Sequence, residues 1–171
     1  MPKLTDRRVI WFALVLCVLA MAGFTVLGRG FPPDSPGIVA LQLAFSKATF
    51  AGILQQWGPA GVRAFQMTTL WVDSWFPVAY ALLLSSLLAA LARGSSGRLT
   101  HPGDTTLALP WLAMGLDWLE NSLHLLLLRD PGNLSATLVW VASVAAAVKW
   151  GLIAVTVLVL VLGLYRRLRT R

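Results

Sequence analysis

The stretch GLDWLENSLHLLLL, residues 115–128, carries polar side chains in a run that otherwise consists of leucine, tryptophan and small residues. Among them, Asp117, Glu120, Asn121 and His124 are spaced i, i+3, i+4 and i+7. In an α-helix this spacing predicts one polar stripe, with leucines over the rest of the surface. We therefore expect the four side chains to form one site, or one wall of a site.

The composition of the chain indicates that this helix belongs to a membrane protein. Of 171 residues, 57% are hydrophobic and only 12% are charged, the reverse of the balance of a soluble globular surface. The net charge of +7 suggests nucleic acid as an alternative partner, but the arginines gather at segment ends and form no basic face with interleaved aromatics. The single cysteine, Cys17, excludes an internal disulfide and a thiolate metal cluster.

Insertion energetics require the polar stripe to face protein. Ten leucines between Leu107 and Leu128 contribute about −0.5 kcal/mol each, whereas a central Asp or Glu costs about +3 kcal/mol. Two such carboxyl groups bring the sum close to zero, and Asn121 and His124 make it less favourable still. We expect this helix to insert only as part of a bundle, with its stripe turned away from lipid.

Four apolar segments predict an all-α fold, a four-transmembrane-helix bundle in a single integral membrane domain of residues 1–171. The predicted spans are about 9–27, 69–92, 105–128 and 135–165. Asp104 is placed to cap the third span, and residues 129–132 to end it. At ~1.5 Å per residue the fourth span exceeds a ~30 Å hydrocarbon core, so it should tilt or project.

Residues 37–57 alternate apolar and polar side chains at helical spacing, which predicts an amphipathic interfacial helix between the first and second spans. Gly58 is expected to end this helix and Pro59 to begin the next one. The apolar face of the predicted helix carries Leu41, Phe45, Ala48, Leu54 and Trp57.

The first span has a cleaved signal peptide as its alternative. Residues 20–22, Ala-Met-Ala, fit the small-x-small pattern of a cleavage site. The apolar run continues through Phe24 and Val26 to Leu27, beyond that pattern. This continuation favours an uncleaved anchor.

The distribution of lysine and arginine predicts the orientation. The positive-inside rule places both termini in the cytoplasm of a multi-pass protein of the plasma (inner) membrane. Lys149 belongs to neither side, because it lies in the middle of the fourth span. One side would hold Lys3, Arg7, Arg8, Arg93, Arg98, Arg166, Arg167, Arg169 and Arg171, and the other Arg29, Lys47, Arg63 and Arg129.

The second and fourth spans carry groups that match the stripe. In the second span, Asp73 and Tyr80 share a face, and Pro77 lacks the N–H that would bond the carbonyl of Asp73. That carbonyl needs another partner. In the fourth span, Lys149 shares its face with alanines that allow close helix contact. We expect Lys149 to pair with a carboxylate of the stripe.

These positions define a candidate site. The candidate catalytic residues are Asp117, Glu120 and Lys149. The candidate ligand-binding residues are Asp73, Tyr80, Trp118, Asn121, His124 and Trp150.

Each candidate also has a structural alternative. Lys149 would form an ion pair that only orients helices, His124 would reach interfacial water, and Trp118 and Trp150 would serve ordinary packing. A metal site is not expected, because His101 and His124 are the only histidines and a single imidazole with carboxylates is an uncommon ligand set. No motif for another cofactor is present.

The order of three motifs resembles a group of small bacterial four-helix integral membrane proteins of uncharacterised function. The motifs are WGPAG with VDSWFPVAY, then LDWLENSLH, then VASVAAAVKWG, and the resemblance extends from Leu41 onward. It implies an architecture and no activity. The motif positions in this chain are Asp73, Pro77, Tyr80, Asp117, Glu120, Asn121, Lys149 and Trp150.

A looser resemblance is to the emopamil-binding and sigma-2 receptor type of four-helix membrane protein. In that type, intramembrane carboxylates and aromatics bind or isomerise sterols, and the Asp followed by Phe-Pro and Tyr in residues 73–80 is similar. The histidine and glutamate that its sterol isomerases place in earlier helices have no match here. The resemblance therefore implies a lipid-like ligand and not an enzyme activity.

Three functions fit these residues. In the first, the buried site binds or acid–base transforms a lipid, sterol or isoprenoid-like molecule: one of Asp117 and Glu120 keeps a proton and donates it to an alkene, while the other pairs with Lys149. The second is a proton or small-cation transporter subunit, which requires a homo-oligomer because four helices make a thin pathway. The third is a structural or accessory membrane protein.

The leucine-rich wall, the tryptophans and the segment 37–57 favour the first function. The expected partners are membrane lipids or a lipid-like small molecule, and not nucleic acid. Whether the protein is an enzyme stays open at this point.

Overall fold

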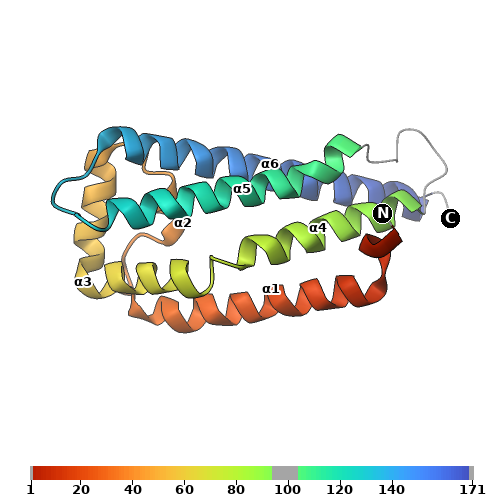
Figure 1. The fold of residues 1–171 in the computed structure, drawn as a ribbon, viewed down its shortest axis with the longest axis horizontal. Helices are drawn as coiled ribbons and strands as arrows, with labels where there is room; N and C mark the ends of the chain where they lie inside the picture. Colours follow the sequence, from red (N-terminus) through yellow and green to blue (C-terminus); the bar gives the residue numbers. More distant parts are fainter. Residues whose placement is uncertain (1, 94–103, 170–171) are drawn as a thin grey trace.

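A computed structural model describes residues 2–93 and 104–169 of the chain, and in these ranges all regular structure is helical. Figure 1 shows the helices packed as an elongated bundle. The elements are η1 (Pro2–Thr5), α1 (Arg7–Leu27), η2 (Gly28–Gly30), α2 (Ile38–Gln42), α3 (Lys47–Trp71), α4 (Phe76–Arg93), α5 (Asp104–Leu127) and α6 (Ala136–Arg169).

Three helices within the described residues are long and apolar enough to cross a membrane: Arg7–Gly30, Phe76–Arg93 and Ala136–Arg169. The chain is therefore a helical membrane protein. The helix α5 forms where the third span is predicted, but it is not among the three because its polar stripe lowers its apolarity. The helix α6 has 34 residues, about 51 Å at ~1.5 Å per residue, and so exceeds the ~30 Å core as predicted.

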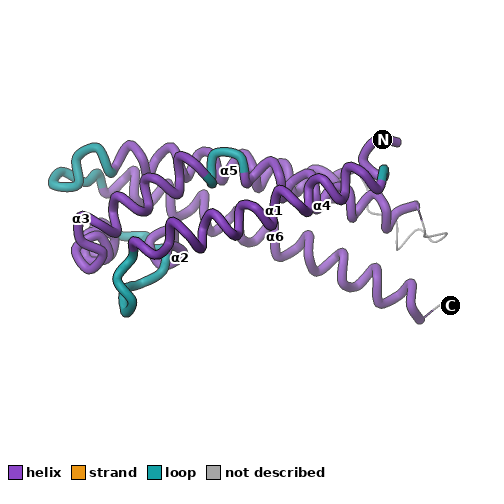
Figure 2. Tube along the Cα trace, turned by 90° about the horizontal axis from the view of Figure 1, so that it is seen from below, coloured by secondary structure: helices purple, strands orange, loops and turns teal. Residues whose placement is uncertain are grey.

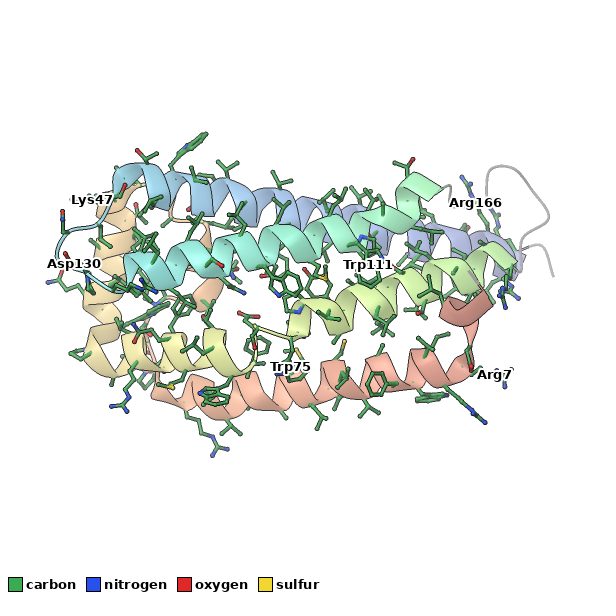
Figure 3. The ribbon with its side chains drawn as sticks, in the orientation of Figure 1. Arg7, Lys47, Trp75, Trp111, Asp130 and Arg166 are labelled. Carbon is green, nitrogen blue, oxygen red and sulfur yellow. The ribbon has the colours of Figure 1, made fainter. Side chains whose placement is uncertain are left out.

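Neighbouring helices in the bundle follow the order α1, α4, α5, α6. The helix α4 packs along both α1 and α5, and α5 packs along α6. Figure 2 shows that the last turns of α6 diverge from the other helices. The charged side chains labelled in Figure 3 lie at the two ends of the bundle, Arg7 and Arg166 at one and Lys47 and Asp130 at the other. The start of η1 and the end of α6 thus share one end, as expected for termini on one side of a membrane.

Some predicted features fall outside the described residues. Arg98, His101 and Arg171 lie there, and so do the side chains of Lys3 and of Asp104, the predicted cap of the third span.

Residues 37–57 do not form the single helix that the periodicity predicts. The helix α2 ends at Gln42 and α3 begins at Lys47, because the side chain of Ser46 accepts a hydrogen bond from the amide of Thr49 and caps a new helix. Between the two helices, Phe45 adopts a φ of 51° and its amide donates to Ser143 Oγ at 3.0 Å.

The restart at Lys47 changes which side chains are buried. Phe45 and Ala48, predicted on the apolar face, are exposed. Leu41, Leu54 and Trp57 are buried as predicted, but in a core with residues of α5 and α6 rather than against a membrane surface. The segment closes one end of the bundle, where the first half of α3 runs across the other helices (Figure 1).

The helix α3 turns sharply at Gly58. This residue has φ 62° and ψ −178°, a conformation that residues other than glycine rarely adopt. Pro59 follows and begins the second half of the helix, as the sequence predicts. The kink redirects α3 from the end of the bundle to its long axis (Figure 1).

The predicted second span, 69–92, is interrupted. The helix α3 ends at Trp71 and α4 begins at Phe76, and residues 72–75 form a turn that we call the break. The amide of Asp73 donates to the carbonyl of Thr68, five residues earlier, at 3.0 Å. In a regular α-helix it would donate to the carbonyl four residues earlier. Pro77 prevents the helix from continuing through this point, since it offers no N–H to the carbonyl of Asp73.

The break lies beside the C-terminal part of α1. A Cβ atom added to Gly23 would lie 2.9 Å from Val72 Cγ2, so only a glycine allows this approach without rearrangement. Asp73, which follows Val72, is buried.

Candidate functional site

Lys149 of α6 lies between two carboxylates of α5. Its Nζ atom donates a hydrogen bond to Asp117 Oδ1 at 2.9 Å and is 2.6 Å from Glu120 Oε2. The exposed fraction is 2% for Lys149, 5% for Asp117 and 0% for Glu120, so the three charges have almost no water around them. We expected one of the two carboxylates to pair with Lys149, and the geometry pairs it with both.

Tyr80 of α4 reaches the same cluster. Its hydroxyl donates to Asp117 Oδ2 at 3.1 Å. Asp117 therefore accepts from Tyr80 on one oxygen and from Lys149 on the other. This bridge connects α4, α5 and α6 at one point.

His124 continues the polar stripe beyond Glu120. Its Nδ1 atom is 3.7 Å from Glu120 Oε1, and neither ring nitrogen has a hydrogen-bond partner in the described part of the chain. The ring stacks on Phe50 and meets the edge of Phe65, with both centroids 5.7 Å away. His124 is fully buried, so it does not reach interfacial water.

The polar face of α5 also binds the break. Asn121 Nδ2 donates to the carbonyl of Asp73 at 3.4 Å, which is the carbonyl that Pro77 leaves without a helical donor. Trp118 Nε1 donates to the carbonyl of Ser74 at 3.0 Å. The partner that the sequence requires for the Asp73 carbonyl is therefore Asn121.

A groove of about 430 Å³ leads to this cluster. Its polar positions are Asp73, Tyr80, Asp117 and Lys149, together with Gln42 of α2. The rest of the lining is mostly apolar and comes from α1, α2, α4 and α6: Met21, Phe24, Ile38, Val39, Phe76, Leu83, Leu84, Trp150, Ile153 and Val157.

Trp150 joins the groove to α2. Its Nε1 atom donates to Gln42 Oε1 at 3.1 Å, and its ring centroid lies 5.2 Å from Lys149 Nζ, a cation–π distance. Gln42 has no place in the predicted site, because residues 37–57 read as a surface helix. Its position as a polar residue amid apolar neighbours is the signal that points to it.

The predicted site residues converge in part. Asp73, Tyr80, Asp117, Lys149 and Trp150 line the groove. The remaining four do not line it: Glu120, Asn121 and His124 are buried, and Trp118 is exposed where it donates to the carbonyl of Ser74. Sequence reasoning also missed Phe24 and Ile153 in the groove and Phe50 and Phe65 around His124.

The cluster offers acids, a base and hydrogen-bond donors in a desolvated setting. Asp117 and Glu120 pair with one ammonium group and Asp73 lines the same groove, so the formal charge of the cluster is negative when all three carboxyl groups are ionised. Within residues 2–93 and 104–169, no group of three or more His, Cys, Asp or Glu side chains is arranged to hold a metal ion. No family model, no curated protein and no solved structure matches this chain.

Proposed function

We propose that the protein binds a lipid, sterol or isoprenoid-like molecule in the groove, with its polar end at Asp73, Tyr80, Asp117 and Lys149. The observation that carries this proposal is a mostly apolar groove that ends on a buried charged cluster. Ligand pockets of this kind bind the apolar body by area and orient the molecule through a few polar groups. An aqueous ion would gain nothing from the apolar walls.

The rim of the groove supports entry from the bilayer. Met21 of α1 and Val157 of α6 are 55% and 43% exposed, and both helices are long and apolar enough to span a membrane. In a bilayer these side chains face lipid tails. We therefore propose that the ligand enters laterally between α1 and α6.

The proposed chemistry, where the ligand is transformed as well as bound, is acid–base isomerisation. A proton passes from a carboxyl group to an alkene carbon, and a proton on a neighbouring carbon returns to a carboxylate, which moves the double bond. Asp117 is the group of α5 that lines the groove, and because both its oxygens accept hydrogen bonds it would be the carboxylate to which the proton returns. Glu120 acts through Lys149. The face of Trp150 would stabilise the intermediate cation.

The membrane arrangement that we propose has four crossings in one domain. The helix α5 provides one, because its polar stripe is buried while Leu112, Leu119 and Leu126 are exposed on its opposite side. The second half of α3 together with α4 provides another. Both termini lie in the cytoplasm of the plasma membrane, on the basis of the lysine and arginine distribution. The resemblance to the small bacterial four-helix proteins belongs to the same proposal.

The test is mass spectrometry of the small molecules that the protein retains after gentle detergent purification. Ile153→Trp should fill the groove and remove the retained lipid-like species. Leu158→Trp is the matched control, because Leu158 lies on the same helix but is exposed outside the groove. Identical retained species in both variants and in the wild type would contradict the proposal.

A further inference from the structure

We propose that the break between α3 and α4 binds a monovalent alkali cation, for which Na⁺ is the probe, through oxygens of Thr69, Asp73 and Asn121. The proposal does not depend on lipid binding, although Asp73 also lines the groove. The proposal is based on oxygens at the break that lack the partners their positions would normally provide.

The hydroxyl of Thr69 is the first of these oxygens. Thr25, Thr68 and Thr156 each donate to the carbonyl four residues earlier at 2.8 Å, the usual solution for a hydroxyl in a membrane helix. Thr69 is 2% exposed, and its Oγ1 atom has no partner among the residues that the structure describes. Burying a hydroxyl without a hydrogen-bond partner or a bound ion in an apolar environment is unfavourable.

The backbone carbonyl of Thr69 also lacks its usual helical donor. In a regular helix the amide of Asp73 would donate to the carbonyl of Thr69, but here it donates to the carbonyl of Thr68. Thr69 therefore presents its hydroxyl and its carbonyl at the end of α3. Broken membrane helices use such freed carbonyls to coordinate cations.

Asp73 supplies the charge. It follows Thr69 by four residues, across the end of α3, and its side chain is buried at the break. No hydrogen bond from the described residues reaches its carboxylate, although the residue is buried. A cation at this point would neutralise a carboxylate that Lys149 does not contact.

Asn121 supplies the last oxygen. Its amide lies against the break, with Nδ2 3.4 Å from the carbonyl of Asp73. Its Oδ1 atom has no partner within the described ranges, and the residue is 6% exposed. Hydroxyl, carbonyl, amide and carboxylate oxygens are the hard ligands that alkali and alkaline-earth cations prefer. A single carboxylate matches a single positive charge.

The experiment measures the thermal unfolding midpoint, Tm, of the purified protein by tryptophan fluorescence. NaCl replaces N-methylglucamine chloride at constant ionic strength, so that screening stays the same. For the wild type we expect a saturable rise in Tm of about 4 °C or more. Thr69→Val and Asp73→Asn should each abolish the rise, while their unfolding transitions in N-methylglucamine show that they fold.

Thr68→Val is the matched control. Thr68 is the adjacent residue and equally buried, but its hydroxyl is satisfied by Ala64. This variant should keep the full rise with Na⁺. A wild type that unfolds at the same temperature in both salts would overturn the proposal and leave internal water as the partner of these oxygens. Equal rises in Thr69→Val and Thr68→Val would overturn it as well.

Discussion

The ammonium of Lys149 lies 2.6 Å from Glu120 Oε2 with essentially no water around either group. Buried charges are expensive to desolvate, and the cost is offset only while the partners stay together. Asp117 is a second buried carboxylate that depends on the same ammonium. The ion pair therefore connects α5 and α6 whether or not the site also carries out chemistry.

Replacing Lys149 by Met should lower the free energy of unfolding by about 3–5 kcal/mol, because two carboxylates then lose their shared cation. The measurement is reversible unfolding in mixed detergent micelles. Adding Asp117→Asn and Glu120→Gln to Lys149→Met should restore much of the loss, since no charge is then left unpaired. A triple variant as unstable as Lys149→Met would contradict this account.

Removing the hydroxyl of Tyr80 tests the bridge from α4. Tyr80→Phe leaves Asp117 Oδ2 without its donor, and we expect a loss of about 1.5–3 kcal/mol in the free energy of unfolding. Tyr165→Phe is the control, because that side chain is exposed on α6 and is not part of the cluster. Equal effects of the two substitutions would show that the Tyr80 hydroxyl contributes no stability through Asp117.

The contact between Gly23 and Val72 positions the break. Gly23→Ala should cost about 1–3 kcal/mol of stability, because the stiff side chain of Val72 is 2.9 Å from the new Cβ atom. Gly115→Ala, where an added Cβ meets nothing within 4 Å, should be neutral or stabilising. The double variant Gly23→Ala with Val72→Ala should recover stability relative to Gly23→Ala alone. Failure of that rescue would show that the contact does not carry the effect.

The sequence predicts what depends on periodicity and on the cost of burying charge. The spacing of Asp117, Glu120, Asn121 and His124 is sufficient to predict one buried face on α5, and Lys149 in an apolar span requires a carboxylate partner. Likewise, Pro77 predicts that the carbonyl of Asp73 needs another donor, which Asn121 provides.

What the sequence did not predict depends on local capping and on tertiary packing. Ser46 caps a new helix and shifts the register after Gln42, so the single helix over 37–57 was wrong. The second span, predicted as one helix over 69–92, is interrupted. The carbonyls of Asp73 and Ser74 accept hydrogen bonds from side chains of α5 and not from backbone amides of the same helix. The position of Gln42 in the groove follows from the same packing, and its local signal is that it is a polar residue amid apolar neighbours.

For His124 we expect a substitution that does not lower the free energy of unfolding, unlike those above. Its nitrogens have no hydrogen-bond partner within residues 2–93 and 104–169, and the ring packs between Phe50 and Phe65. His124→Phe should therefore keep the packing, remove two unsatisfied polar atoms and leave the free energy of unfolding within about 1 kcal/mol or raise it. Phe50→Ala, which empties the same space, should cost about 3–5 kcal/mol.

Ligand retention in the same variant separates packing from function. Because His124 does not line the groove, His124→Phe should retain the same small molecules as the wild type in mass spectrometry. A loss of more than about 2 kcal/mol in stability would instead mean that the nitrogens of His124 have a bound partner, because the substitution would then break a buried hydrogen bond. Retained stability with lost ligand would assign His124 to the binding site through Glu120, whose Oε1 atom is 3.7 Å away.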